Sequence, residues 1–149
     1  MKKIVLVVLA FMLTACSFDA KNELTQNQTK WEQANIDSYR FSLMIGCFCA
    51  FMDRMPLTIE VNNGQVTSIK YADGSSVDST DGQFEYFNRF ATMDGLFAEV
   101  KADQNGAAEE VKVTYDSTYG YPSQISVDRI KAAVDDEYSL TVSNFEVLK

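Results

Sequence analysis

The stretch LTIEVNNGQVTSIKY, residues 57–71, contains two short patterns of alternating apolar side chains on either side of Asn63-Gly64. Alternation with a period of two is typical of a β-strand that buries one face. An Asn-Gly pair between two such patterns favours a tight turn that joins antiparallel strands. The stretch therefore predicts a β-hairpin, and with it an antiparallel sheet.

The register of this hairpin depends on the length of its loop. A two-residue loop would place Ile59 opposite Ser68, which mixes an apolar and a polar side chain on one face. A three-residue loop, Asn63 to Gln65, places Ile59 opposite Ile69 instead. Because a slip of one residue moves every side chain to the other face of a sheet, we expect the three-residue loop.

The segments that flank the hairpin show similar patterns. Residues 39–51 alternate like a strand, with Gly46 as a point where it can bend. Thr92 is a suitable N-cap for a helix whose apolar side chains follow at positions i, i+3, i+4 and i+7. Asn105-Gly106 ends that helix. Residues 111–115, 125–127 and 138–142 alternate again, and the phase change at Phe145 and Val147 predicts a bulge near Ser143-Asn144.

An N-terminal helix completes the expected fold. Residues 22–35 suit a helix with Leu24, Trp31 and Ala34 on its buried side. We therefore predict an α+β domain in which this helix is followed by the order β-β-β-α-β-β-β. Short connections make neighbouring strands antiparallel, so the strands should form one curved antiparallel sheet packed on a helix.

The first fifteen residues, MKKIVLVVLAFMLTA, have the features of an export signal. Lys2 and Lys3 precede an apolar run of residues 4–13, which is too short to span a membrane. The tetrapeptide Leu13-Thr14-Ala15-Cys16 resembles the lipobox of bacterial lipoproteins. The resemblance implies that residues 1–15 are removed, that the Cys16 thiol receives a diacylglycerol and that the new amine is acylated.

The same resemblance implies a destination. Several acyl chains give stable anchoring, since each buried CH₂ contributes about 0.8 kcal/mol. Ser17 stands where many lipoproteins retained in the inner membrane carry Asp, so we expect the periplasmic face of the outer membrane. The polar residues 16–30 are interpreted as the lipidated cysteine and a tether, and residues 31–149 as a single domain.

Composition excludes several classes of function. The chain has a formal net charge of −8 and contains no histidine. An acidic surface argues against nucleic acid as a partner. Without histidine, Ser-His-Asp triads, Cys-His pairs and histidine metal sites are excluded. We expect no catalytic residue, no metal site and no cofactor other than the covalent lipid on Cys16.

Cys47 and Cys49 are left as an even pair in an oxidising compartment. Two residues of extended strand place Cα atoms roughly 6.6–7 Å apart, at the limit for a disulfide, so the chain would have to bend to join them. Three alternatives remain: a local disulfide, two buried thiols, and a redox or copper(I)-handling pair. The last would recruit soft methionine ligands, with candidates Met44, Met52 and Met55.

Tyr119, Tyr121 and Pro122 form a second candidate site. Gly120 can take a positive φ and Pro122 fixes the entry into the next strand, so the segment predicts a rigid turn. Tyrosines on such a turn can form an interaction surface, although they can also cap the end of a sheet. The acidic side chains of the chain are better explained as solvated surface.

These motifs occur together in a family that the chain resembles. The order Trp31, Tyr39-x-Phe41, Cys47-x-Cys49, Asn63-Gly64, Leu96-Phe97 and the segment G-Y-P-x-x-I-x-x-D (residues 120–128) is similar to a family of small bacterial lipoproteins of unknown function. That resemblance implies one domain and an envelope location, but no activity. We expect a non-enzymatic binding or support module with an unknown envelope protein or small ligand as its partner. The alternative is a thiol-redox or soft-metal protein that uses Cys47 and Cys49.

Overall fold

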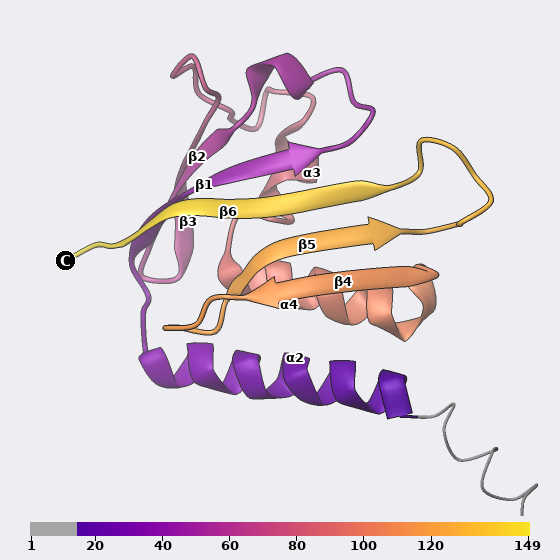
Figure 1. Ribbon diagram of the computed structural model, residues 1–149. Coiled ribbons are helices and arrows are strands. Elements are labelled where there is room, and N and C mark those ends of the chain that lie inside the picture. Colours follow the sequence, from indigo (N-terminus) through magenta and orange to yellow (C-terminus); the bar gives the residue numbers. More distant parts are fainter. Residues whose placement is uncertain (1–14) are drawn as a thin grey trace, which may run out of the picture.

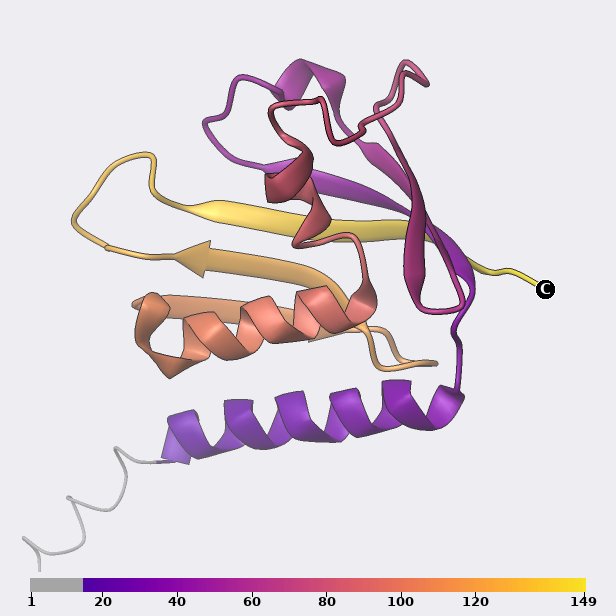
Figure 2. The ribbon, with the colours of Figure 1, turned by 180° about the vertical axis from the view of Figure 1, so that it is seen from behind.

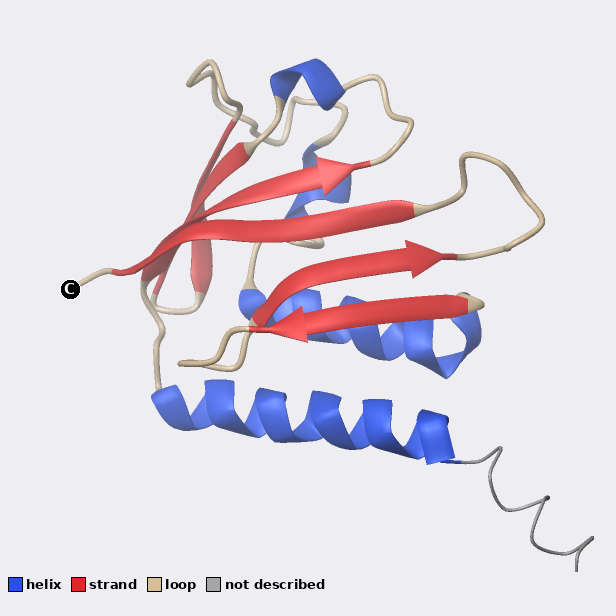
Figure 3. Ribbon diagram, viewed as in Figure 1, coloured by secondary structure: helices blue, strands red, loops and turns tan. Residues whose placement is uncertain are grey.

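The computed structural model describes residues 15–149. Within this range six strands form one antiparallel sheet, accompanied by helices, which confirms an α+β fold (Figures 1 and 3). The elements in chain order are α2 (Ala15–Ala34), β1 (Tyr39–Gly46), η2 (Met52–Arg54), β2 (Leu57–Asn62), β3 (Gln65–Lys70), α3 (Phe84–Asn88), α4 (Met93–Ala102), η3 (Asp103–Ala107), β4 (Glu110–Tyr115), β5 (Pro122–Asp128) and β6 (Tyr138–Val147).

The sheet consists of two three-stranded meanders joined through the first and last strands of the chain. Its strand order is β3-β2-β1-β6-β5-β4, and β1 pairs with β6 from Tyr39↔Val147 to Gly46↔Ser139. Helices α3 and α4 cover one face of the sheet, and α2 lies beside α4 (Figure 2). The chain therefore forms two helices, α3 and α4, between β3 and β4, where the sequence predicted one.

Strand β1 shows why the core forms on one side of the sheet. Its side chains alternate between buried and more exposed positions along its whole length. The buried ones, Tyr39, Phe41 and Leu43, oppose the buried apolar residues of β2. The strand ends at Gly46, so the prediction that it continues through residue 51 is wrong. Pairing with β6 stops at Gly46↔Ser139, and without a partner strand the chain turns away.

The hairpin of β2 and β3 corrects one prediction and confirms another. The loop has two residues, because Asn62 pairs with Gln65 and Val61 with Val66; the three-residue loop is wrong. Ile59 nevertheless lies opposite Ile69, as expected. The register shifts between Glu60 and Val61, so the single-residue offset is absorbed inside the strands by a bulge. The hydrophobic face keeps its pairing without a longer loop.

The predicted bulge in β6 is confirmed. The register of β1 against β6 shifts between Arg40 and Ser42, opposite Asn144, which has a φ of 51°. The extra residue returns Phe145 to the inner face, where its ring lies 5.5 Å from that of Tyr39. The change of phase in the sequence thus marks the bulge that keeps Phe145 in the core.

Helix α4 begins as predicted. The Thr92 side chain accepts a hydrogen bond from the backbone N–H of Gly95 at 3.0 Å. The four apolar side chains of the expected stripe are all buried, namely Met93, Leu96, Phe97 and Val100. Gly106, with a φ of 112°, lies in the turn η3 that follows the helix.

Helix α2 is longer than the sequence suggested. The segment 16–30, interpreted as a polar tether, lies within α2, which is a correction to that boundary. Leu24 and Trp31 are buried against the domain, as expected for the helix's inner side. The remainder of the predicted signal, residues 1–14, lies outside the described residues. Among the described residues, no helix combines the length and apolar character needed to cross a membrane.

Candidate functional site

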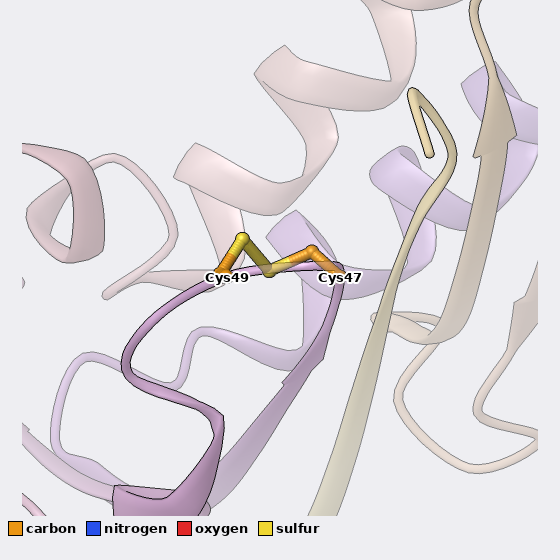
Figure 4. Close-up of a disulfide and its surroundings, with 2 residues drawn as sticks. All are labelled: Cys47 and Cys49. Carbon is orange, nitrogen blue, oxygen red and sulfur yellow. A yellow bond between two sulfur atoms is a disulfide. The ribbon is translucent and has the colours of Figure 1, made fainter. Parts of the chain in front are cut away.

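Cys47 and Cys49 are joined by a disulfide directly after β1 (Figure 4). The sulfur atoms are 2.04 Å apart and the Cα atoms 5.3 Å apart. The Cα separation is shorter than two residues of extended strand would give, because the chain leaves the sheet after Gly46. Of the three alternatives for this pair, the structure contains the local disulfide. The side chain between the two cysteines, Phe48, is 86% exposed.

The methionines near the disulfide do not converge on it as ligands would. Met44 lies on β1 at an exposed position, Met55 is buried in the core, and Met52 lies in η2. Sulfurs bonded to each other are also not the thiolates that a soft metal ion prefers. Among the described residues, no group of three or more His, Cys, Asp or Glu side chains is arranged to hold a metal ion.

A hollow of about 340 Å³ lies beside the disulfide. We call it the disulfide hollow; its walls include Cys47, Cys49, Arg89, Glu99, Arg129 and Tyr138. These side chains come from four parts of the chain: the loop after β1, the α3–α4 connection, helix α4, and the segment between β5 and β6 with the start of β6. The sheet and α4 therefore bring together residues that are far apart in the sequence.

Glu99 is the centre of the charged network in this hollow. Arg89 donates a hydrogen bond from Nη2 to Glu99 Oε1 at 2.6 Å. Arg129 Nη2 lies 3.7 Å from the same oxygen. The hydrogen bond to Glu99 raises the pKa of Arg89 above its usual value. Both guanidinium groups are about half exposed, so each keeps N–H donors directed to solvent.

Tyr138 and Asp103 extend the network into the protein interior. The Tyr138 hydroxyl donates a hydrogen bond to Asp103 Oδ2 at 2.6 Å, and it lies 3.2 Å from Glu99 Oε1. Burial, followed by the hydrogen bond to Asp103, raises the pKa of Tyr138 far above its usual value. Asp103 is 1% exposed, and its second oxygen lies 3.5 Å from Arg129 Nη2. Two carboxylates thus face two guanidinium groups, and the buried charges are compensated.

The sequence interpretation missed this network. Arg89, Glu99 and Arg129 have no diagnostic spacing, because the fold and not a motif brings them together. One signal was available: Glu99 of α4 and Asp103 at the C-cap of the same helix are four residues apart, a spacing that places them on one side beside the apolar stripe. Two acidic residues so close to a buried face require cationic or hydroxyl partners.

The structure places the other candidate site residues separately. Cys16 is the second residue of α2. Tyr121 and Pro122 are buried and Tyr119 is half-buried, so only part of this turn is accessible and the interaction surface stays a prediction. The ring of Tyr121 lies 4.6 Å from that of Phe145 and 6.1 Å from that of Trp31. The β4–β5 turn that carries Tyr119 and Tyr121 lies at the end of the sheet opposite the loop after β1 (Figure 1).

Comparison with known protein families gives a match over most of the chain. The model of a family of unknown function, DUF6174, matches residues 23–147. The matched range begins inside α2 and ends with the last residue of β6, so it contains the whole sheet and the disulfide hollow. No curated protein matches the chain.

Proposed function

We propose, from the premise that the chain belongs to the family of unknown function DUF6174, that it is a lipid-anchored protein of the bacterial cell envelope. In this proposal residues 1–15 are removed, Cys16 carries the lipid, and the domain faces the periplasm from the outer membrane. Its biochemical role is to bind an envelope protein or a small ligand, without catalysis. The two parts of the proposal, anchor and binding, have separate support.

Export is supported by the pattern of residues 1–16 and by the disulfide between Cys47 and Cys49. Disulfides persist in oxidising compartments such as the periplasm and are rare in the cytosol. A lipoprotein signal and a disulfide are independent features of the chain that agree on one compartment.

Binding is supported by one observation, the disulfide hollow with its two half-exposed arginines. Arg89 and Arg129 are held in place by Glu99 and keep donors for a ligand that presents carboxylate or carbonyl oxygens. Such a ligand or peptide segment would contact both guanidinium groups. The described residues offer no nucleophile paired with a general base in the hollow, and binding is the simpler role for it.

The anchor is tested with Cys16→Ala in the full chain. We expect the wild-type protein in the membrane fraction and the variant in the soluble periplasmic fraction, because the lipid is the only proposed attachment. A variant in which Cys47 and Cys49 are both changed to Ala serves as a control and should stay with the membrane. Continued sedimentation of Cys16→Ala with membranes contradicts the anchor.

The binding role is tested by affinity capture with the lipidated protein. Partners retained by the wild type should be lost with Arg129→Ala. They should be kept with Arg40→Ala, which removes an arginine paired with Glu146 on the exposed face of the sheet. Equal capture by all three proteins would place the binding surface elsewhere.

A second candidate function is thiol–disulfide exchange, favoured by the exposure of Phe48 between the two cysteines. In that reaction a partner thiolate attacks one sulfur, a mixed disulfide forms, and the other sulfur leaves as a thiolate. Intact mass after alkylation, with and without a mild dithiol reductant, decides this point. Rapid reduction and double alkylation under native conditions would favour exchange; a disulfide that persists would favour the structural role.

A further inference from the structure

We infer that the end of the domain at which α2 begins lies against the lipid bilayer, with Phe48, Ile130 and Val134 inserted at its surface. The inference rests on the proposed lipid at Cys16. It adds an orientation and a lipid-contacting surface that the anchor alone does not supply. Because Phe48 and residues 135–138 also line the disulfide hollow, a ligand of that hollow would be bound at the membrane surface. We call this region the anchor end; it consists of the start of α2, the loop after β1 (residues 47–51) and the loop between β5 and β6 (residues 129–137).

These three segments are neighbours in space. In Figures 1 and 2 the start of α2, the loop after β1 and the β5–β6 loop all lie on the same side of the molecule, opposite the C-terminus. Two hollows connect them: one is lined by Lys21 of α2 together with Lys131, and the other by Phe48 together with Asp135. The β5–β6 loop therefore lies between α2 and the disulfide loop.

The anchor end exposes large apolar side chains. Phe48 is 86% exposed, Val134 85% and Ile130 54%. Phe48 is presented by a short loop that the disulfide closes, so it cannot fold back into the core without moving both cysteines. An exposed aromatic ring and two aliphatic side chains at one end of a domain are typical of a surface that meets lipid or another protein.

The position of Cys16 indicates that the exposed apolar side chains of the anchor end contact lipid. Cys16 lies in the first turn of α2, and the same helix is fixed to the domain by buried Leu24 and Trp31. With a rise of 1.5 Å per residue, Leu24 lies only about 12 Å along the helix from the lipidated residue. A rigid connection of this length leaves no tether. The acyl chains therefore hold the anchor end at the membrane surface.

The charges at this end do not form a surface that attracts anionic lipid. Lys21 and Lys131 are both exposed, but Asp135 and Glu137 are exposed beside them. These opposite charges leave the region without a basic patch for anionic lipid. The apolar side chains are the groups that gain from contact with a bilayer, and a zwitterionic lipid surface is the one that fits.

The test uses Phe48→Trp in the full lipidated chain, reconstituted into vesicles of phosphatidylethanolamine and phosphatidylcholine with brominated acyl chains. Bromine quenches indole fluorescence only at short range. A side chain inserted roughly 5–10 Å into the interface should lose at least about half of its emission. The native Trp31 is an internal reference, because it is buried and lies about 22 Å along α2 from Cys16.

Val147→Trp is the matched control. Val147 is also an exposed apolar residue, but it ends β6 at the opposite end of the β1–β6 pair. We expect quenching for Phe48→Trp and none for Val147→Trp or the wild type. Val134→Trp, on the other loop, should behave like Phe48→Trp and serves as a second variant if the first does not fold.

The remaining outcomes overturn the inference in distinguishable ways. If the protein floats with the vesicles but neither Phe48→Trp nor Val134→Trp is quenched, the lipid anchor stands and the orientation is wrong. Quenching of Val147→Trp to the same extent would mean that the domain lies on its side. If the wild-type protein does not float with vesicles, the proposed anchor fails and the inference fails with it.

Discussion

The two ends of this domain differ in how they are closed. At the end near the C-terminus, the ring of Trp31 makes edge contacts with Tyr39, Tyr121 and Phe145 at 5.5 to 6.1 Å. At the other end, Phe48 is exposed above a hollow whose walls carry Arg89 and Glu99. The first end is completed by aromatic packing, and we call it the closed end. The second end, which is also the anchor end, leaves apolar and charged groups accessible, and we call it the open end. We therefore expect the closed end to contribute mainly to stability and the open end mainly to interaction.

The largest expected effect comes from the closed end. Trp31→Ala removes the side chain that joins α2 to the sheet, and we expect it to lower the free energy of unfolding by about 3–5 kcal/mol. Phe48→Ala at the open end should change it by less than about 0.5 kcal/mol, because the ring is exposed. Urea denaturation followed by circular dichroism measures both. Similar losses for the two variants would refute the division between the ends.

Alkaline pH gives the next largest effect. Burial raises the pKa of Tyr39 and of Tyr121 from 10 to about 12. The unfolded chain thus releases these protons at lower pH than the folded one, so the stabilisation is complete below pH 10 and is lost as the pH rises from 10 to 12. For Tyr39, the more deeply buried of the two, a raised pKa of this size corresponds to about 2–3 kcal/mol; Tyr121 contributes less. Unfolding free energies at pH 9 and pH 11.5 measure the loss.

Tyr39→Phe is the matching variant for that titration. It removes one buried ionisable group, so stability should fall less between pH 9 and pH 11.5 than in the wild type. It also removes the hydroxyl that accepts a hydrogen bond from the backbone N–H of Met93, at the start of α4. At pH 9 the variant should therefore be less stable by about 1–2 kcal/mol. An unchanged pH dependence would exclude Tyr39 as a source of the effect.

The smallest expected effect belongs to the charged network of the open end. Glu99→Gln leaves Arg89 and Arg129 without their shared carboxylate, and we expect a loss of about 1 kcal/mol because both guanidinium groups remain in contact with water. Glu146→Gln, which breaks the exposed pair with Arg40, should cost less than about 0.5 kcal/mol. Thermal unfolding of both variants tests this. A larger loss of stability for Glu146→Gln than for Glu99→Gln would contradict this prediction.

The apolar pattern predicted the sheet well because each strand buries one face, and this burial requires apolar residues at alternate positions. Ile59 opposite Ile69 and the bulge at Asn144 follow from that pattern. The loop length did not follow, because a bulge inside the hairpin gives the same pairing as a longer loop. Sequence alternation alone cannot distinguish the two solutions, since both keep the apolar residues on one face.

The charged network and the extent of α2 were not predicted, for a different reason. Arg89 and Arg129 meet Glu99 only because α4 packs against β5, and this packing leaves no local pattern. The residues before Trp31 are mostly polar because one face of α2 is solvated, and polar composition alone was interpreted as a tether. The helix predicted over residues 22–35 already contains Leu24; the missed part is its first turns, which begin at Ala15.

The pairing of β1 with β6 also determines when the domain can fold. The two central strands of the sheet are the first and the last in the chain. A chain that emerges from a ribosome or a translocation channel can form either meander locally, but it cannot join them until residues 138–147 are free. The pairing of β1 with β6, the most extensive between any two of the described elements, forms only at the end of synthesis. A deletion of the last strand should therefore prevent folding altogether, and not merely shorten the sheet.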